Sequence, residues 1–154
     1  MSWLELKVKP PIIACIAILM MLLLDGLRSD VHLGLGTFGV GLALLLVILG
    51  VWLSLIGIQQ FLKSETTVHP DLQHATNTLV TSGVYQISRN PMYLGLLLIL
   101  IAFAIWLNSW LAIGVCVLFV LYLNQFQIKP EERFLHAKFT RQYEGYCKTV
   151  RRWL

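Results

Sequence analysis

A polar cluster followed by an apolar run is the first place in this chain where the residues could do chemistry. The cluster reads Arg89-Asn90-Pro91-Met92-Tyr93-Leu94-Gly95. Asn90 suits the N-cap of a helix and Pro91 suits its first turn, so free backbone N–H groups at this helix start would favour an anion. Gly95, one turn later, leaves a notch where a ligand or another helix can approach.

A second cluster, Glu131 and Glu132, begins a charged and aromatic stretch near the end of the chain. One stripe at helical spacing runs from this cluster and joins a carboxylate to aromatic rings. Its members are Glu132, His136, Phe139, Tyr143 and Tyr146.

Each feature taken alone has a simpler interpretation. Asn-Pro is a common helix cap, and paired glutamates after a proline favour the positive end of a new helix. Aromatic residues on an amphipathic helix usually bury against a membrane or a helical bundle. Arg89 could anchor a membrane boundary or contact a lipid headgroup.

The composition places these clusters on a membrane protein. Of the 154 residues, 57% are hydrophobic and only 13% are charged, which no ordinary soluble domain matches. We therefore expect an all-α integral membrane protein in which residues 1–154 form a single domain. Apolar runs of suitable length predict four transmembrane helices, at about residues 11–24, 40–61, 92–107 and 110–128.

The third and fourth runs are separated only by Asn108 and Ser109, so they must be antiparallel neighbours. Trp106 and Trp110 beside this break suit a membrane interface. Because the two polar clusters flank this hairpin, both should meet at one membrane surface, with Arg89 and Tyr93 near the glutamates.

The distribution of basic residues predicts which side of the membrane each end of the chain occupies. With four spans, the amino terminus, the polar loop 63–90 and the tail 129–154 share one side, which holds all the lysines and arginines except Arg28. By the positive-inside rule that side is cytoplasmic. The formal charge of +4 then indicates contact with anionic lipids before nucleic acid.

Cysteine and histidine do not indicate a metal site. Cys15, Cys116 and Cys147 form neither a disulfide framework nor a metal-binding spacing. His69, His74 and His136 likewise lack the spacing of metal ligands. We expect no bound metal.

The order and spacing of these motifs resemble the isoprenylcysteine carboxyl methyltransferase and phospholipid methyltransferase superfamily. The similar segments are Leu79 to Tyr85, Arg89 to Gly95, Glu131-Glu132 with Leu135, and Phe139, Tyr143 and Tyr146, with Thr66 to Pro70 similar to the segment before the motif. Two positions depart from the family pattern, which often has His at Asn90 and Gly at Thr140.

The resemblance implies methyl transfer from S-adenosylmethionine at a site built by the cytoplasmic loop and the amphipathic C-terminal helix. It implies catalytic roles for Arg89 and Glu132, with Arg89 orienting an anionic group of the acceptor. The cofactor-binding residues that it implies are Tyr85, Asn90, Tyr93, Gly95, Glu131, Glu132 and Tyr143.

The acceptor stays open at this point. A prenylated thiol or carboxylate, a phospholipid amine and a small lipophilic thiol could each enter from the bilayer, and we expect the bacterial inner membrane as the location. Two other classes also stay open: a nicotinamide-dependent membrane reductase related to sterol reductases, and a non-catalytic membrane partner protein.

Overall fold

The computed structural model describes residues 5–27, 33–64 and 78–154, and its regular elements are all helices. Four of them lie side by side: α1 (Pro10–Leu27), α2 (Gly36–Ser64), α3 (Pro91–Trp106) and α4 (Trp110–Leu123). A short 3₁₀-helix, η1 (Gly83–Gln86), precedes α3, and a π-helical segment, η2 (Asn124–Ile128), joins α4 to α5 (Lys129–Thr149). The expected all-α class is confirmed.

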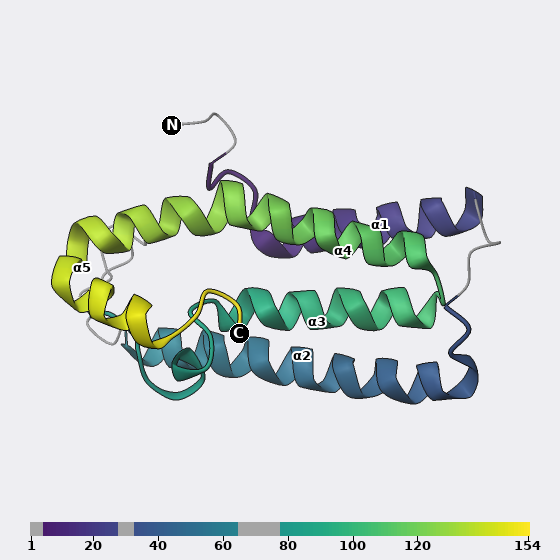
Figure 1. The fold of residues 1–154 in the computed structure, drawn as a ribbon, viewed down its shortest axis with the longest axis horizontal. Coiled ribbons are helices and arrows are strands. Elements are labelled where there is room, and N and C mark those ends of the chain that lie inside the picture. Colours follow the sequence, from purple (N-terminus) through teal and green to yellow (C-terminus); the bar gives the residue numbers. More distant parts are fainter. Residues whose placement is uncertain (1–4, 28–32, 65–77) are drawn as a thin grey trace.

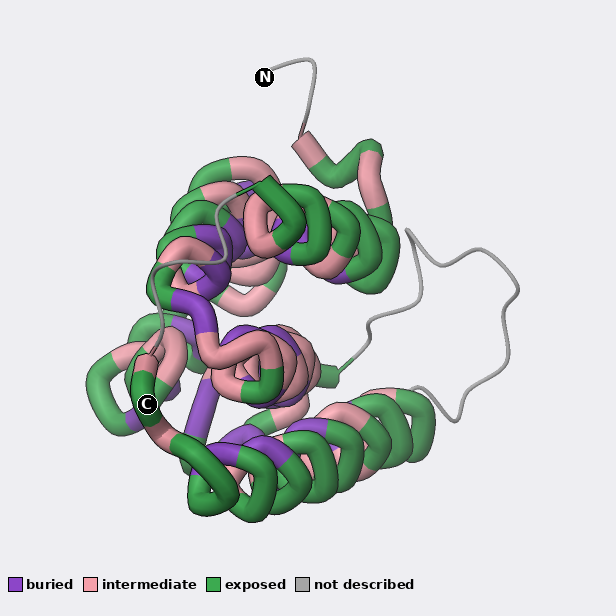
Figure 2. Tube along the Cα trace, turned by 90° about the vertical axis from the view of Figure 1, so that its right-hand side faces the viewer, coloured by how far each residue is buried: buried purple, intermediate pink, exposed green. Residues whose placement is uncertain are grey.

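Helix α3 lies in the middle of the bundle, between α2 on one side and the pair α1 and α4 on the other (Figures 1 and 2). The core between α1, α3 and α4 contains Met21, Leu100 and Leu123, all completely buried. The start of α1, the end of α2, the start of α3 and the end of α4 lie at the same end of the bundle, where α5 folds over them (Figure 1).

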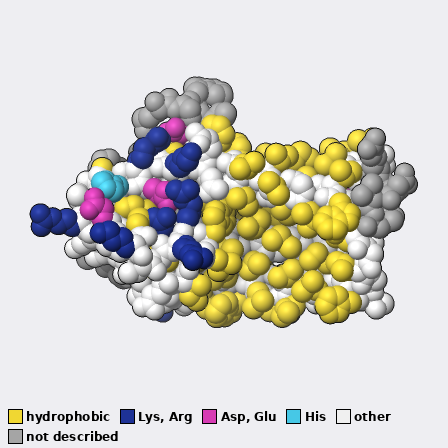
Figure 3. Space-filling view, viewed as in Figure 1, with side chains coloured by type: hydrophobic (Ala, Val, Ile, Leu, Met, Phe, Trp, Pro, Cys, Tyr) yellow, Lys and Arg dark blue, Asp and Glu magenta, His cyan; other side chains and the backbone are white. Residues whose placement is uncertain are grey.

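Three segments are long and apolar enough to cross a membrane: α1, residues 36–63 of α2, and the continuous helix Trp110–Thr149, whose apolar part is α4. Helix α3 is equally apolar but has only 16 residues. On the face shown in Figure 3, apolar side chains cover the length of the helical bundle, and charged side chains gather at the end that carries α5. The chain therefore has the surface of a membrane protein with one polar end.

Observed boundaries differ from the predicted ones in α2, which begins at Gly36 rather than near residue 40. Gly34 and Gly36 have φ angles of 73° and 52°, which glycine adopts without strain, so the glycine-rich stretch forms the turn into α2. Some residues discussed above lie outside the described residues: Arg28, and, in the predicted loop, residues 66–70 and His74.

The predicted hairpin between α3 and α4 is present (Figure 1). Asn108 turns the chain with a φ of 54°, a conformation that asparagine tolerates better than most residues. Its carbonyl accepts a hydrogen bond from the Leu33 N–H at 2.8 Å, which ties this turn to the residues before α2. Trp106 and Trp110 are exposed beside it.

Helix α3 packs against α2 through facing glycines. A methyl group added to Gly50 would lie 2.7 Å from the Gly95 carbonyl oxygen, and one added to Gly95 would lie 2.5 Å from the Gly50 carbonyl oxygen. The Ser54 hydroxyl, which donates to the Met92 carbonyl at 3.4 Å, also occupies the notch at Gly95. Small residues allow this close approach, as is common between membrane helices.

The helix of the fourth predicted span does not end before Lys129 and Pro130. Instead, α4 continues through η2 directly into α5. Proline lacks the N–H that an α-helix would bond to the preceding turn, and the wider π-helical turn before Pro130 accommodates that loss without breaking the helix.

Helix α5 reverses direction at Thr140, where φ is 26° and ψ is −96°. The predicted stripe from Glu132 to Tyr146 is thus wrong as one face of a straight helix. Glu132 lies on the first arm of α5, whereas Tyr143 and Tyr146 lie on the returning arm (Figure 1). Because α5 folds back, residues of both of its arms lie near the start of α3.

The glycine contact predicts a strong effect of Gly95→Ala. The added methyl group would meet the backbone of α2, and overpacking of this kind costs about 1–3 kcal/mol. We expect a lower midpoint of thermal unfolding in detergent. Gly114→Ala in α4 is the matched control, because nothing lies within 4 Å of that position. Equal midpoints for both variants would contradict the packing described here.

The reversal of α5 predicts that Thr140→Gly stabilises the protein. A β-branched residue at positive φ is strained by about 1–3 kcal/mol, and glycine relieves that strain while losing more backbone entropy on folding. We expect a net gain of about 1 kcal/mol in the free energy of unfolding. Thr140→Ala keeps the Cβ atom and should give no such gain; a gain as large as that of glycine would show that strain at this position is absent.

Candidate active site

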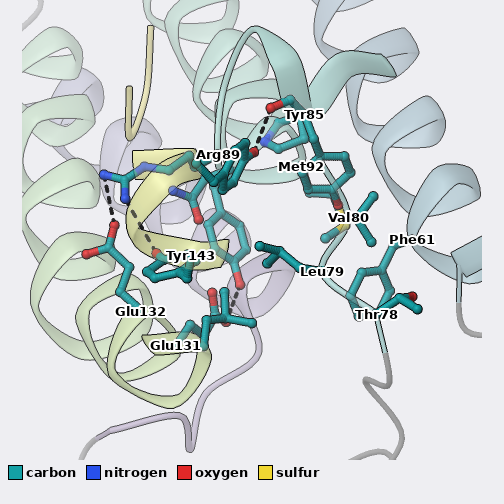
Figure 4. Close-up of a pocket in the computed structure, with 15 residues that line it drawn as sticks. Phe61, Thr78, Leu79, Val80, Tyr85, Arg89, Met92, Glu131, Glu132 and Tyr143 are labelled. Carbon is teal, nitrogen blue, oxygen red and sulfur yellow. Dashed lines mark hydrogen bonds and ion pairs between the residues drawn. The ribbon is translucent and has the colours of Figure 1, made fainter. Parts of the chain in front are cut away.

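One pocket opens at the polar end of the bundle, where α3, the first arm of α5 and its returning arm converge (Figure 4). It encloses about 120 Å³. The charged and hydrogen-bonding residues in its wall are Thr78, Tyr85, Arg89, Asn90, Tyr93, Glu131, Glu132, Tyr143 and Tyr146. Its apolar wall consists of Phe61, Leu79, Val80, Pro91, Met92 and Leu135.

Every site residue expected from the sequence except Gly95 lines this pocket. Gly95 faces α2 instead, and the α2 backbone and Ser54 fill its notch. Of the two occupants expected for that notch, a ligand or a helix, the structure places a helix there. Gly95 positions the site indirectly by holding α3 close to α2.

The segment before α3 is built around Gly83 and Tyr85. Gly83 has a φ of 61°, and the next N–H, that of Val84, donates to the Gln60 side chain at 3.1 Å. The buried Tyr85 hydroxyl donates to the Gly57 carbonyl at 3.3 Å. Burial raises the pKa of Tyr85 above its ordinary value, so the phenol stays protonated and keeps η1 attached to α2.

The returning arm of α5 is held against this segment by Tyr146, whose hydroxyl donates to the Tyr85 carbonyl at 2.6 Å. Burial raises the pKa of Tyr146 to about 12. A small buried cluster lies beside the pocket and consists of Val84, Tyr85, Tyr143, Tyr146 and Val150. This cluster packs the returning arm of α5 against η1.

The two glutamates have different environments. Glu131 Oε1 accepts hydrogen bonds from the Tyr93 hydroxyl and from Gln127 Nε2, each at 2.6 Å. Within the described part of the chain no donor bonds to its second oxygen, Oε2, which leaves that oxygen for a ligand. Burial raises the pKa of Glu131, and the hydrogen bonds from Tyr93 and Gln127 partly oppose that rise.

Glu132 is shared by two guanidinium groups. Arg152 donates to it from Nε at 3.0 Å and from Nη2 at 2.6 Å, a bidentate pair. Arg89 Nη2 lies 3.3 Å from Glu132 Oε1. The hydrogen bonds that Arg152 donates to Glu132 are the main reason that the pKa of Arg152 is raised.

Arg89 is largely buried, with 14% of its side chain exposed. Its Nη1 donates to the Tyr143 hydroxyl at 3.5 Å (Figure 4) and also contacts the Cys147 sulfur. Its Nε is buried and has no hydrogen-bond partner among the described residues, which leaves one Arg89 donor for an acceptor atom from outside the protein.

Asn90 precedes α3 as predicted, but its side chain does not cap the helix. Its Nδ2 donates instead to the Arg152 carbonyl at 2.9 Å. The start of α3 borders the pocket through residues 90–93. Its first N–H groups are therefore near the pocket, where the positive end of the helix favours negative charge.

Three polar residues that contact the site were given no role there from the sequence: Gln127, Arg152 and Tyr146, although Tyr146 belongs to the predicted stripe. Gln127 precedes Glu131 by four residues, a spacing that could have suggested their hydrogen bond. Arg152 and Tyr146 contact the site only because α5 reverses, which no local pattern indicated. Among the described residues no group of three or more His, Cys, Asp or Glu side chains could hold a metal ion.

Fold and site together define a helical membrane protein with a pocket of both charges at one end of its bundle. The profile of the family described as "phospholipid methyltransferase" matches residues 38–142. This chain belongs to that family, which is related to the isoprenylcysteine carboxyl methyltransferases. The match includes every predicted site residue except Tyr143.

A protein of Haemophilus influenzae is 51% identical to this chain over 63 residues. These residues make up 41% of this chain and the whole of that relative, which is described only as an uncharacterized protein. No solved structure matches the chain.

Proposed function

We propose that this protein transfers a methyl group from S-adenosylmethionine to a lipophilic acceptor that reaches the pocket from the bilayer. The observation that carries the proposal is a single pocket lined by a guanidinium, two carboxylates, aromatic rings and an apolar wall. Membership of the phospholipid methyltransferase family supports both the reaction and the cofactor.

The residues present fit this cofactor. S-adenosylmethionine carries a sulfonium cation, an amino group, a carboxylate and an adenine ring. Glu131 offers an unbonded carboxylate oxygen, and the Tyr93 and Tyr143 rings offer faces that bind a cation or stack on a purine. Ligand pockets commonly enclose about 300–1,000 Å³, so side chains of this smaller pocket must move apart on binding.

The chain's own task in the reaction is alignment. When bound, the cofactor supplies a methyl carbon attached to a positively charged sulfur. Glu131 and Glu132 hold the cationic part, and Arg89 directs its unpartnered Nε to an anionic group of the acceptor. The wall of Phe61, Leu79 and Met92 excludes water, which keeps the acceptor atom in line for displacement.

We further propose that α1 to α4 all span the membrane. Helix α3 is about 24 Å long at ~1.5 Å per residue, which is short of a hydrocarbon core of about 30 Å, but its neighbours shield it on both sides. The pocket would then face the cytoplasm of a bacterial inner membrane, with the basic residues of α5 near anionic headgroups.

The apolar wall favours an acceptor that partitions into the bilayer. A prenylated thiol or carboxylate, a phospholipid amine and a small lipophilic thiol each have a reactive atom attached to an apolar body. All three classes would present that atom to the charged side of the pocket while the body contacts the apolar side.

The first test compares binding of S-adenosylmethionine with that of S-adenosylhomocysteine, which lacks the positive charge on sulfur, by isothermal titration in detergent. Burial favours protonated Glu131, so we expect the preference for the charged ligand to grow as the pH rises from about 5 to about 8 and more Glu131 ionises. Glu131→Gln should remove most of this pH dependence.

Glu144→Gln is the matched control for this titration, because Glu144 lies on the same helix but is exposed and pairs with His136. It should bind both ligands as the wild type does. Absence of binding to folded wild-type protein would disprove the proposed function. Binding of a nicotinamide dinucleotide in its place would favour the reductase class.

A second test addresses Arg89. We expect Arg89→Ala to reduce transfer of a tritiated methyl group from S-adenosylmethionine into a total lipid extract by about 100-fold or more, because the anionic acceptor loses its partner. The dissociation constant for the cofactor should change far less than this, because the two hydrogen bonds from Arg152 still hold Glu132 in place. Arg141→Ala, an exposed arginine of α5, serves as the control. Loss of cofactor binding in Arg89→Ala would contradict the assignment.

A further inference from the structure

Residues 150–153 lie against the site although they follow the last helix (Figure 1). The backbone makes three contacts with the residues just before α3. The Arg151 carbonyl accepts the Arg89 N–H at 3.0 Å, and the Arg152 carbonyl accepts from Asn90 Nδ2 at 2.9 Å and from the Ser88 hydroxyl at 3.4 Å.

Side chains of the same segment bind two other elements. Trp153 donates from Nε1 to the Asn124 side chain in η2 at 3.1 Å and packs against the core of the bundle. Arg152 binds both oxygens of Glu132 in α5. Residues 150–153 therefore join the start of α3, η2 and the first arm of α5.

The side chains of the two neighbouring arginines in this segment point in different directions. The Arg151 side chain is exposed, whereas Arg152 faces the site and keeps 34% of its side chain exposed. The two arginines are adjacent in the sequence and carry the same charge. Among the described residues, the Arg152 side chain donates hydrogen bonds to a residue that lines the pocket, whereas Arg151 contacts the site through its backbone carbonyl.

We propose that Arg152 is a positioning residue of the cofactor site: it fixes the Glu132 carboxylate in the pocket wall and, through its own carbonyl, fixes Asn90 at the start of α3. This inference rests on the proposed function, because it assumes that Glu132 and Asn90 face S-adenosylmethionine. Arg152 itself does not line the pocket and touches no reacting group.

Electrostatics alone predicts the opposite result from positioning, which makes the proposal testable. The sulfonium of S-adenosylmethionine is a cation, so removal of a nearby positive charge would strengthen its binding if charge were all that mattered. If Arg152 positions Glu132, Arg152→Gln must weaken binding, because the carboxylate can then leave the pocket wall.

The experiment measures binding of S-adenosylmethionine by isothermal titration for Arg152→Gln, Arg152→Lys and Arg151→Gln. We expect about tenfold weaker binding for Arg152→Gln, the loss of a charged bidentate pair discounted for its partial exposure. Arg152→Lys keeps the charge but lacks the planar fork and should fall between this variant and the wild type. Arg151→Gln should bind within about twofold of the wild type.

A double-mutant cycle identifies the partner through which Arg152 acts. In a Glu132→Gln background, Arg152→Gln should cause little further loss, whereas in a Glu131→Gln background its full effect should remain. If Arg152→Gln acted through a general loss of folding, it would weaken binding by the same factor in both backgrounds. Wild-type affinity in Arg152→Gln, tighter binding, or full additivity with Glu132→Gln would each overturn the proposal.

The same cycle, measured on thermal unfolding without cofactor, separates this proposal from the proposed function. If wild-type protein does not bind S-adenosylmethionine, the methyltransferase proposal and the cofactor role of Arg152 fail together, even where the unfolding cycle shows coupling of Arg152 to Glu132. If wild-type protein binds the cofactor and Arg152→Gln binds equally well, only the positioning role fails.

Discussion

The Glu132 carboxylate, shared between Arg89 and Arg152, is the interaction on which the rest of the site depends. Only 18% of its side chain is exposed, and a buried charge is tolerated only when it is paired. Each arginine comes from a different part of the chain, one before α3 and one after α5. The ion pairs therefore determine how closely these two segments approach each other, and with them the shape of the pocket between.

Much of this site could be predicted because topology restricts a membrane chain so strongly. Once two apolar helices are joined by a two-residue turn, the polar residues flanking them must lie at the same end. That argument placed Arg89, Tyr93 and both glutamates together without any knowledge of side-chain contacts. The length of the apolar runs was equally informative for the four helices of the bundle, because few conformations other than a helix satisfy the backbone inside a bilayer.

The remaining features depended on contacts between distant residues. The conformation of Thr140 is unfavourable for threonine, so no local preference indicated the reversal of α5, although glycine is common at this position in the family. Gly95 was compatible with either a ligand or a helix, and only the position of Gly50 on α2 decides between them. Arg152 resembled its neighbour Arg151 in the sequence and differs only in the direction of its side chain.

The π-helical segment η2 controls the direction in which both glutamates point. A π-helical turn holds one residue more than an α-helical turn, and one residue rotates everything that follows by about 100°. If these five residues formed an ordinary α-helix instead, the helix after them would be rotated by nearly the angle that one residue contributes, and Glu131 would turn away from Tyr93. The rotational register of α5, and not the chemistry of its side chains alone, thus decides whether the carboxylates face the pocket.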